Sequence, residues 1–171
     1  MPAQLVAFYN YSLGLTHSGY FMLEEATGMD ASAYAKQYLF DPLEVEFTRW
    51  DHDPFGVDAG GYWMRPRDMA RFGQLYLEGG TIEDSTGATV DPFNTSVTNW
   101  VGESTATYVA PGSWGNTSVL PSHYQHGYGY WWRTGVLGGQ GAVWAWGWGG
   151  QFIVVVPSRQ LVVVTTSKWN I

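Results

Sequence analysis

The chain has 171 residues, no cysteine and a formal net charge of −7. This length suits one ordinary domain, and the missing cysteines exclude disulfides, thiol catalysis and thiolate metal ligands. The few basic residues are scattered, so we expect no nucleic-acid partner and no attraction to an anionic membrane surface. The longest apolar run, Phe152 to Val156, is too short to span a bilayer. Aromatic residues at 17% and 22 glycines indicate a core or cleft built from flat rings with close backbone approach.

The first part of the chain carries two helical patterns. After a turn-rich, partly extended entry over residues 1–15, the stretch from Thr16 to Thr27 is predicted to form a helix, with Thr16 as its N-cap and Gly28 as its end. A second helix is predicted to begin at the Asp30 cap and to end at Asp41-Pro42, because the residue before a proline disfavours helical backbone.

Residues 42–62 are predicted to form a long loop, interrupted at Gly60-Gly61. Pro66 then suits the first position of a helix that runs to Leu77 and closes at Gly79-Gly80. Residues 80–125 show no sustained period and are predicted to form a surface excursion, with one short helix near Thr95 to Val101.

The last third of the chain is predicted to consist of strands. They are Tyr128 to Arg133, Ala142 to Trp146, Gln151 to Val156 and Leu161 to Thr166. The stretch from Gln151 to Val156 is almost continuously apolar, which predicts a central strand covered on both faces, and Pro157 to Gln160 is predicted to be the hairpin turn that follows it. Helices followed by an antiparallel sheet of three or four strands make an α+β fold.

A first candidate site lies at Asn10 to His17, where Tyr11 precedes a helix in a glycine-containing turn. A phenol held there would act as a proton donor or, with a lowered pKa, as a base. The alternative is a core tyrosine whose hydroxyl bonds to a backbone carbonyl, and the motif alone favours that alternative.

A second candidate lies at Ala145 to Gln151, where Gly147, Gly149 and Gly150 surround Trp148 at the mouth of an apolar strand. Glycines there let a substrate approach the backbone, and an outward N–H would stabilise an oxyanion. An aromatic-packed edge or bulge explains the same residues equally well.

Several chemistries find no support in the residues. His123 and His126 lie three apart without a third ligand, so we expect neither a metal site nor a cofactor. There is no Gly-x-Ser-x-Gly elbow and no phosphate-binding loop. Neither Lys36 nor Lys168 has a serine three residues before it, and Arg65 to Gly73 is interpreted as scaffold.

Taken together, five segments carry a resemblance to a known family. They are Phe8–Gly28, Tyr38–Leu43, Gly60-Gly61 with Met64–Tyr76 (MRPRDMARFGQLY), Tyr128–Trp132 (YGYWW), and Gly147–Gln151 with Val154–Pro157 and Leu161–Val164. They resemble the serine β-lactamase and penicillin-binding-protein superfamily, in particular the class C β-lactamase-related branch with its family VIII carboxylesterases and 6-aminohexanoate-dimer hydrolases. Residues 81–125 correspond to a variable region.

The resemblance implies acyl transfer to a small acyl substrate through a serine ester, with a Ser-x-x-Lys pair as nucleophile and base and no cofactor. By position, Tyr11 matches the proton-relay tyrosine, and the backbone N–H of Trp148 matches half of the oxyanion hole. Gly147, Gly149 and Gly150 match the open backbone that binds substrate. Trp-Gly-Gly in place of Lys-Thr-Gly is more similar to the esterase and amide-hydrolase branches. Leu13 stands where the family has a polar residue.

The resemblance further implies that residues 1–171 form one partial domain. Residues 1–80 would be the helical part with the tyrosine motif, residues 81–125 the variable excursion, and residues 126–171 the strands with the third motif. The nucleophile helix and the closing C-terminal helix would both be missing, so we expect the C-terminal part of a serine hydrolase that is inactive alone. Whether this chain is itself an enzyme stays open, and so does its compartment, because residues 1–20 show no signal peptide.

Two other hypotheses stay open. A non-catalytic module would bind glycans or peptidoglycan on an aromatic platform; its rings would be Tyr128, Tyr130, Trp131, Trp132, Trp144, Trp146 and Trp148. The residues favour a simpler role, in which these rings fill the interface between sheet and helix. A complementing fragment would pair its exposed sheet edge with an upstream partner or with a second copy.

Overall fold

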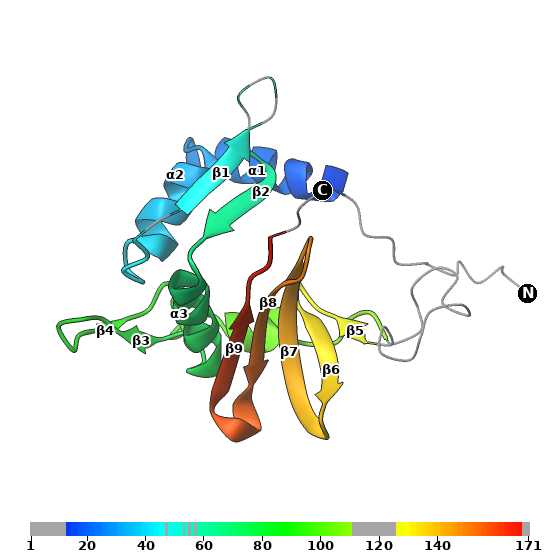
Figure 1. Ribbon diagram of the computed structural model, residues 1–171. Coiled ribbons are helices and arrows are strands. Elements are labelled where there is room, and N and C mark those ends of the chain that lie inside the picture. Colours follow the sequence, from blue (N-terminus) through cyan, green and yellow to red (C-terminus); the bar gives the residue numbers. More distant parts are fainter. Residues whose placement is uncertain are drawn as a thin grey trace, which may run out of the picture.

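The computed structural model describes residues 13–46, 48–52, 54, 56, 58–110 and 126–168. These residues form helices and antiparallel sheets, which confirms the predicted α+β class. One part holds the first helices and a hairpin, and the other part holds a five-stranded sheet with a helix packed on it (Figure 1).

The first two helices end where the sequence predicted. Helix α1 spans Leu13–Thr27, so it begins earlier than predicted and Thr16 lies inside it instead of capping it. It stops at Gly28, which adopts a φ of 69° and donates its N–H to the carbonyl of Glu24 at 2.7 Å. Helix α2 (Ala31–Ala35) has Asp30 at its N-cap and continues into a π-helical turn, Lys36–Phe40.

The predicted loop over residues 42–62 is wrong, because this segment contains two paired strands of a hairpin, β1 (Thr48–His52) and the greater part of β2 (Asp58–Met64). Trp50 and Tyr62 face each other across it with ring centroids 4.7 Å apart, and such aromatic pairs stabilise antiparallel strands. Gly61 does not break the strand. The ladder shifts register between Trp50 and Asp51, and a Cβ on Gly61 would collide with the carboxylate of Asp51.

Helix α3 spans Pro66–Leu77, with the proline at its first turn as predicted. Asp68 in that turn is buried and accepts two hydrogen bonds from Arg65, at 2.9 and 3.1 Å. Arg71 donates to the backbone carbonyls of Leu43 and Glu83. These contacts join α3 to the segments on either side of it, in agreement with a scaffold role.

The described part of the excursion contains a two-stranded hairpin and a short helix. Strands β3 (Ile82–Glu83) and β4 (Thr89–Val90) pair with each other, and α4 spans Trp100–Ser104. The predicted helix near Thr95 to Val101 therefore lies too early in the chain. Asp91 explains the difference, because its carboxylate accepts from the N–H and hydroxyl of Thr95 and holds that segment in a turn.

The main sheet has five antiparallel strands in chain order, one or two more than predicted. They are β5 (Gly127–Tyr128), β6 (Arg133–Leu137), β7 (Gln140–Gly147), β8 (Gln151–Val156) and β9 (Leu161–Thr165). Strands β7 to β9 agree with the prediction to within two residues at each end.

The predicted strand from Tyr128 to Arg133 is wrong, because the chain turns between β5 and β6. Gly129 lies against the carbonyls of Ser104 and Ala106, where a Cβ would collide. Trp131 adopts a φ of 61°, a left-handed conformation that is incompatible with a strand.

Apolar side chains gather on both faces of the sheet. On the face covered by α3, the buried residues are Tyr76, Trp132, Ile153 and Val155. On the other face they are Ala142, Trp144 and Val156. Because β8 contributes to both clusters, its almost continuous apolar sequence is explained.

Candidate functional site

The structure places the third-motif residues, Gly147 to Gly150, at one end of the main sheet. Gly147 ends β7, and Trp148, Gly149 and Gly150 form the turn into β8. This β7–β8 turn lies at the end of the sheet nearest α1, α2 and the β1–β2 hairpin, whereas the β6–β7 and β8–β9 turns lie at the opposite end (Figure 1). Tyr11 lies outside the described residues.

Two glycines make the β7–β8 turn possible. Gly149 and Gly150 adopt φ values of 79° and 89°, which favour glycine because a side chain is strained there. The segment is therefore a tight turn, not a bulge or a packed edge.

Side chains at the start of β8, at the end of β9 and just after β9 fasten this turn. Ser167 donates its hydroxyl to the carbonyl of Gly149, and Thr165 donates its hydroxyl to the carbonyl of Gly150 at 2.9 Å. The side-chain amide of Gln151 donates to the carbonyl of Ser167 at 2.7 Å and accepts from its N–H at 3.2 Å. Gln151 thus forms a paired amide contact with Ser167, similar to one pair in a β-ladder.

The fastened turn leaves Trp148 as the most exposed large apolar side chain among the described residues, at 90% exposure. Because its side chain is almost fully in solvent, burial of that ring does not explain why the turn is held in place. Both carbonyls that follow Trp148 are engaged. A fixed turn of this kind presents backbone N–H groups in a constant geometry, which is what stabilisation of a developing negative charge requires.

A cation lies against the aromatic ring that precedes the turn. The Arg133 guanidinium carbon is 4.6 Å from the ring centroid of Trp146 and 5.7 Å from that of Tyr128. Trp146 also stacks on Phe152, with their ring centroids 5.5 Å apart. No local sequence pattern marks Arg133, because it ends a predicted strand and nothing in the sequence places it near Trp146.

His126 lies on the same sheet face and carries a perturbed imidazole. Its ring contacts Trp144 edge-on at 5.5 Å between centroids, and the residue is buried. Burial lowers the pKa of His126; a hydrogen bond with the backbone of Gly127 opposes this shift, and the charge of Arg133 adds to it. His123 lies outside the described residues.

The seven rings of the hypothetical glycan platform do not share one surface. Tyr128, Trp132 and Trp144 are buried, so they cannot contact an extended ligand. Trp132 packs against Tyr76 of α3, as the simpler interpretation predicted, whereas Trp144 lies on the opposite face of the sheet. Tyr130, Trp131 and Trp148 are exposed.

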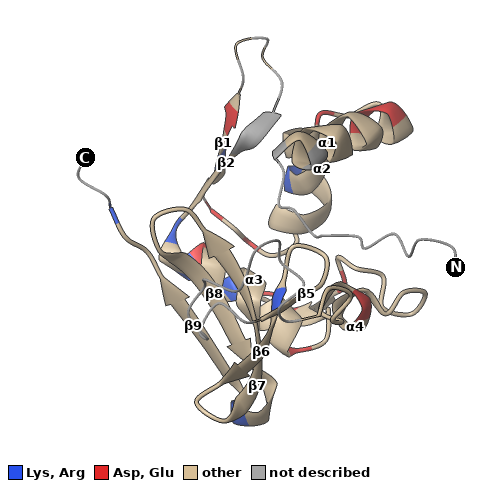
Figure 2. Ribbon diagram, turned by 90° about the vertical axis from the view of Figure 1, so that its right-hand side faces the viewer, with Lys and Arg blue, Asp and Glu red and all other residues tan. Residues whose placement is uncertain are grey.

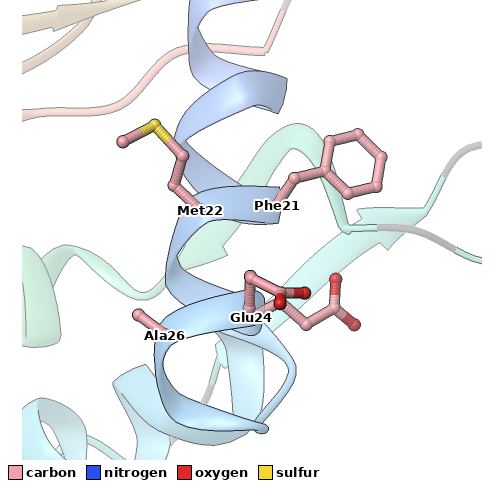
Figure 3. A pocket seen from close by; sticks show the side chains of 5 residues that line it. Phe21, Met22, Glu24 and Ala26 are labelled. Carbon is pink, nitrogen blue, oxygen red and sulfur yellow. The ribbon is translucent and has the colours of Figure 1, made fainter.

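A shallow hollow beside α1 is lined by Phe21, Met22, Glu24, Glu25 and Ala26. Phe21 and Met22 project from opposite sides of the helix (Figure 3), and all five residues belong to this single element. Among the described residues no second element lines this hollow, so these side chains do not converge on a ligand.

Within the part of the chain that the structure describes, no group of three or more His, Asp or Glu side chains is placed to hold a metal ion. None of the described helices is long and apolar enough to cross a bilayer. No protein-family model matches this chain, and no curated protein matches it.

Two of the residues that fasten the β7–β8 turn, Thr165 and Ser167, lie outside the site predicted from sequence, whereas Gln151 lies at its end. Gln151 and Ser167 are sixteen positions apart, and only the pairing of β8 with β9 brings them together. The predicted hairpin contained enough information to place both near the turn, but no local pattern indicated a side-chain contact with the backbone.

Proposed function

We propose that this chain is the C-terminal part of a serine hydrolase related to β-lactamases and penicillin-binding proteins, acting on ester, amide or β-lactam bonds. One observation carries the proposal: the segment with the most specific resemblance, in α3, packs directly on the strand pair that bears the third motif. Gly73 in α3 lies against Ile153 of β8 and Val162 of β9. The helix motif and the strand pair that bears the third motif thus form one scaffold.

In this proposal the backbone N–H of Trp148 stabilises the oxyanion of the acyl-transfer step. The fixed geometry of the turn supports this role, because side chains near the end of β9 donate hydrogen bonds to the carbonyls of Gly149 and Gly150. Tyr11 relays the proton, and α1 begins at Leu13, two residues after it. The turn points toward the part of the molecule that contains α1 (Figure 1).

The nucleophile and its base come from a Ser-x-x-Lys pair that this sequence does not contain. The isolated chain therefore binds no acyl group covalently. Trp-Gly-Gly in place of Lys-Thr-Gly favours ester or amide substrates, since the chain lacks the lysine and threonine that recognise the carboxylate of a β-lactam.

The test is intact mass after treatment with a fluorophosphonate probe. The chain alone is expected to show no stoichiometric adduct. One adduct would place the nucleophile within these 171 residues and would contradict the proposal that it comes from a Ser-x-x-Lys pair outside them. The second arm uses the polypeptide with its natural upstream sequence. It is expected to carry one adduct, on the serine of Ser-x-x-Lys, and to hydrolyse p-nitrophenyl butyrate.

Two substitutions in the upstream-extended polypeptide separate the N–H of Trp148 from its ring. Trp148→Pro removes the N–H and is expected to abolish hydrolysis, whereas Trp148→Phe keeps the N–H and retains most of it. Tyr11→Phe is expected to lower turnover without preventing folding. Absence of an adduct in both arms would rule out the hydrolase proposal.

A specific observation favours complementation through β9 as a second candidate. Among the described strands, β9 is the outermost next to β8, and Leu161 and Val163 are exposed on it. The strand contains no charge and no proline, and it pairs with β8 without a bulge. Such an edge pairs readily with another strand, either from an upstream segment or from a second copy.

Sedimentation at increasing protein concentration tests this candidate. Self-association is expected to rise with concentration and to be lost in Val163→Lys, because a charge on an edge strand opposes pairing. A monomer at all concentrations would exclude the second copy and leave the upstream segment as the partner.

A further inference from the structure

A ladder of aromatic rings leads from the core of the molecule to its surface beside α4. Tyr76, which packs on Trp132 at 4.3 Å between ring centroids, contacts Phe93 at 5.5 Å, and Phe93 contacts Trp100 at 6.4 Å. The indole N–H of Trp100 also donates to the Tyr76 hydroxyl at 3.3 Å. Trp100 is partly exposed, yet core residues hold it at two points.

The outer end of the ladder is a stack of two tyrosines. Tyr130 lies 5.9 Å from Trp100 and stacks on Tyr108 at 4.9 Å with an interplanar angle of 8°. Tyr108 is 56% exposed. Because Tyr130 covers one face of Tyr108, the described residues leave a ligand a single open ring face and not a row of coplanar rings.

The backbone holds these two tyrosines in place before any ligand arrives. The N–H of Tyr108 donates to the carbonyl of Tyr128 at 3.0 Å, and the N–H of Tyr130 donates to the carbonyl of Ser104 at 2.8 Å. The next residue, Trp131, is exposed and has a φ of 61°. Strained conformations of this kind persist only where the surroundings impose them, and they concentrate at functional sites.

Glu103 of α4 gives this side of the stack a negative charge, and α4 carries an acidic segment in Figure 2. The faces of aromatic rings also carry negative electrostatic potential. A hydrogen bond with Tyr130 raises the pKa of Tyr108, and the charge of Glu103 contributes to this rise. Residues 93–110 contain no lysine, arginine or histidine, so no cation from this segment offsets the carboxylate.

We propose that the open face of Tyr108, supported by Trp100 and Tyr130 and flanked by Glu103, binds a compact organic cation that carries an alkylammonium group. A cation over an aromatic face is attracted by the ring quadrupole, and the carboxylate adds a second attraction. The same charges repel an anionic ligand. The site also lacks the row of coplanar rings on which an extended glycan would stack. This Tyr108 site is independent of the proposed hydrolase chemistry.

Choline tests the proposal, with 3,3-dimethyl-1-butanol as its neutral isostere. Titration of the ¹⁵N-labelled chain is expected to shift the indole N–H signal of Trp100, assigned with Trp100→Phe, with a millimolar dissociation constant that rises with salt. The isostere is expected to leave the signal in place. Nε-trimethyllysine presents the same group and is expected to bind as well; tighter binding than choline would indicate a peptide source.

The variants separate the ring, the hydroxyl and the charge. Tyr108→Ala is expected to weaken choline binding by about fivefold or more, and Glu103→Gln to weaken it less. Tyr108→Phe keeps the ring and is expected to retain binding. Tyr38→Ala is the matched control, since Tyr38 is also an exposed tyrosine in contact with another tyrosine, Tyr34, and it is expected to change nothing.

Three results would overturn the proposal. They are no binding of choline or trimethyllysine, equal binding of choline and its neutral isostere, and binding of a neutral oligosaccharide such as cellohexaose that Tyr108→Ala abolishes. The last result would favour a sugar site on the same tyrosine.

Discussion

Gly73 of α3 lies against Val162 of β9 so closely that a Cβ on Gly73 would be 2.6 Å from the Cγ1 atom of Val162 and 2.9 Å from Cγ2 of Ile153. Protein atoms do not approach each other this closely without rearrangement. The helix and the sheet meet at their present distance because residue 73 has no side chain. This contact positions the third-motif strands relative to the helix motif, so it underlies the proposed function.

Gly73→Ala is therefore expected to destabilise the protein. Overpacking a filled core costs about 1–3 kcal/mol, and the better helix propensity of alanine returns about 1 kcal/mol. The net expectation is a lower free energy of unfolding, by up to about 2 kcal/mol, measured by urea denaturation with circular dichroism.

Gly19→Ala is the matched control for that substitution. Gly19 also lies within a helix, α1, but a Cβ there meets nothing within 4 Å, so the substitution is expected to be neutral or stabilising. Val162→Ala added to Gly73→Ala is expected to recover part of the lost stability, because it makes room for the new methyl group. Equal destabilisation by Gly73→Ala and Gly19→Ala would contradict the packing argument.

Substitution by alanine is expected to destabilise the protein strongly at Trp132 and hardly at all at Trp148. Trp132 is 4% exposed and stacks with rings of α3, so Trp132→Ala is expected to cost about 3–5 kcal/mol. Trp148 is almost fully exposed, so Trp148→Ala is expected to change stability by no more than about 0.5 kcal/mol. Thermal denaturation of the two variants measures both, and a large loss in Trp148→Ala would mean that its ring is packed in solution.

Ser167→Ala is expected to loosen the β7–β8 turn without unfolding the sheet. The variant loses the hydrogen bond to the carbonyl of Gly149, which is worth about 1 kcal/mol. Hydrogen exchange is expected to become faster at Gly149 and Gly150 and to stay unchanged in the centre of β8. Ser158→Ala, which removes a hydroxyl bonded to Gln140 at the opposite end of the sheet, is the control. Unchanged exchange at the turn in Ser167→Ala would show that the hydroxyl does not hold it.

His126 is expected to make the folded protein less stable at acidic pH. Burial lowers the pKa of its imidazole in the folded state, so below about pH 6.5 the unfolded chain binds more protons than the folded chain. The free energy of unfolding is therefore expected to fall as the pH is lowered from 7.5 to 5.5. This fall is expected to be smaller in His126→Phe, which keeps a ring against Trp144, and an identical pH dependence in both proteins would contradict the assignment.

Much of the local structure was predictable from the sequence. Proline at the first turn and glycines after Leu77 marked the ends of α3, since these two residue types have the strongest backbone preferences. The apolar run in β8 predicted a strand buried on both sides, as found. The third-motif turn is a candidate site only through resemblance, because by themselves its glycines fit a bulge equally well.

The failures have a common physical origin in contacts between distant residues. The β1–β2 hairpin was taken for a loop because Gly60-Gly61 breaks the local pattern, whereas the pairing of Trp50 with Tyr62 and the packing of Trp50 on Tyr20 stabilise the strand pair. The chain turns after Tyr128 because Gly129 meets the backbone of residues 104 and 106. Neither contact is visible in a window of neighbouring residues.

The sequence by itself determined the α+β class, the order of helices before strands, and the extents of α3 and β8, because periodicity and backbone preference act over a few residues. Only the tertiary structure decided which of the aromatic rings are buried. Trp131 and Trp132 are adjacent in sequence, yet one is exposed and the other packs in the core. Burial depends on which distant surfaces a side chain meets, and that is set by the assembled sheet and helix together.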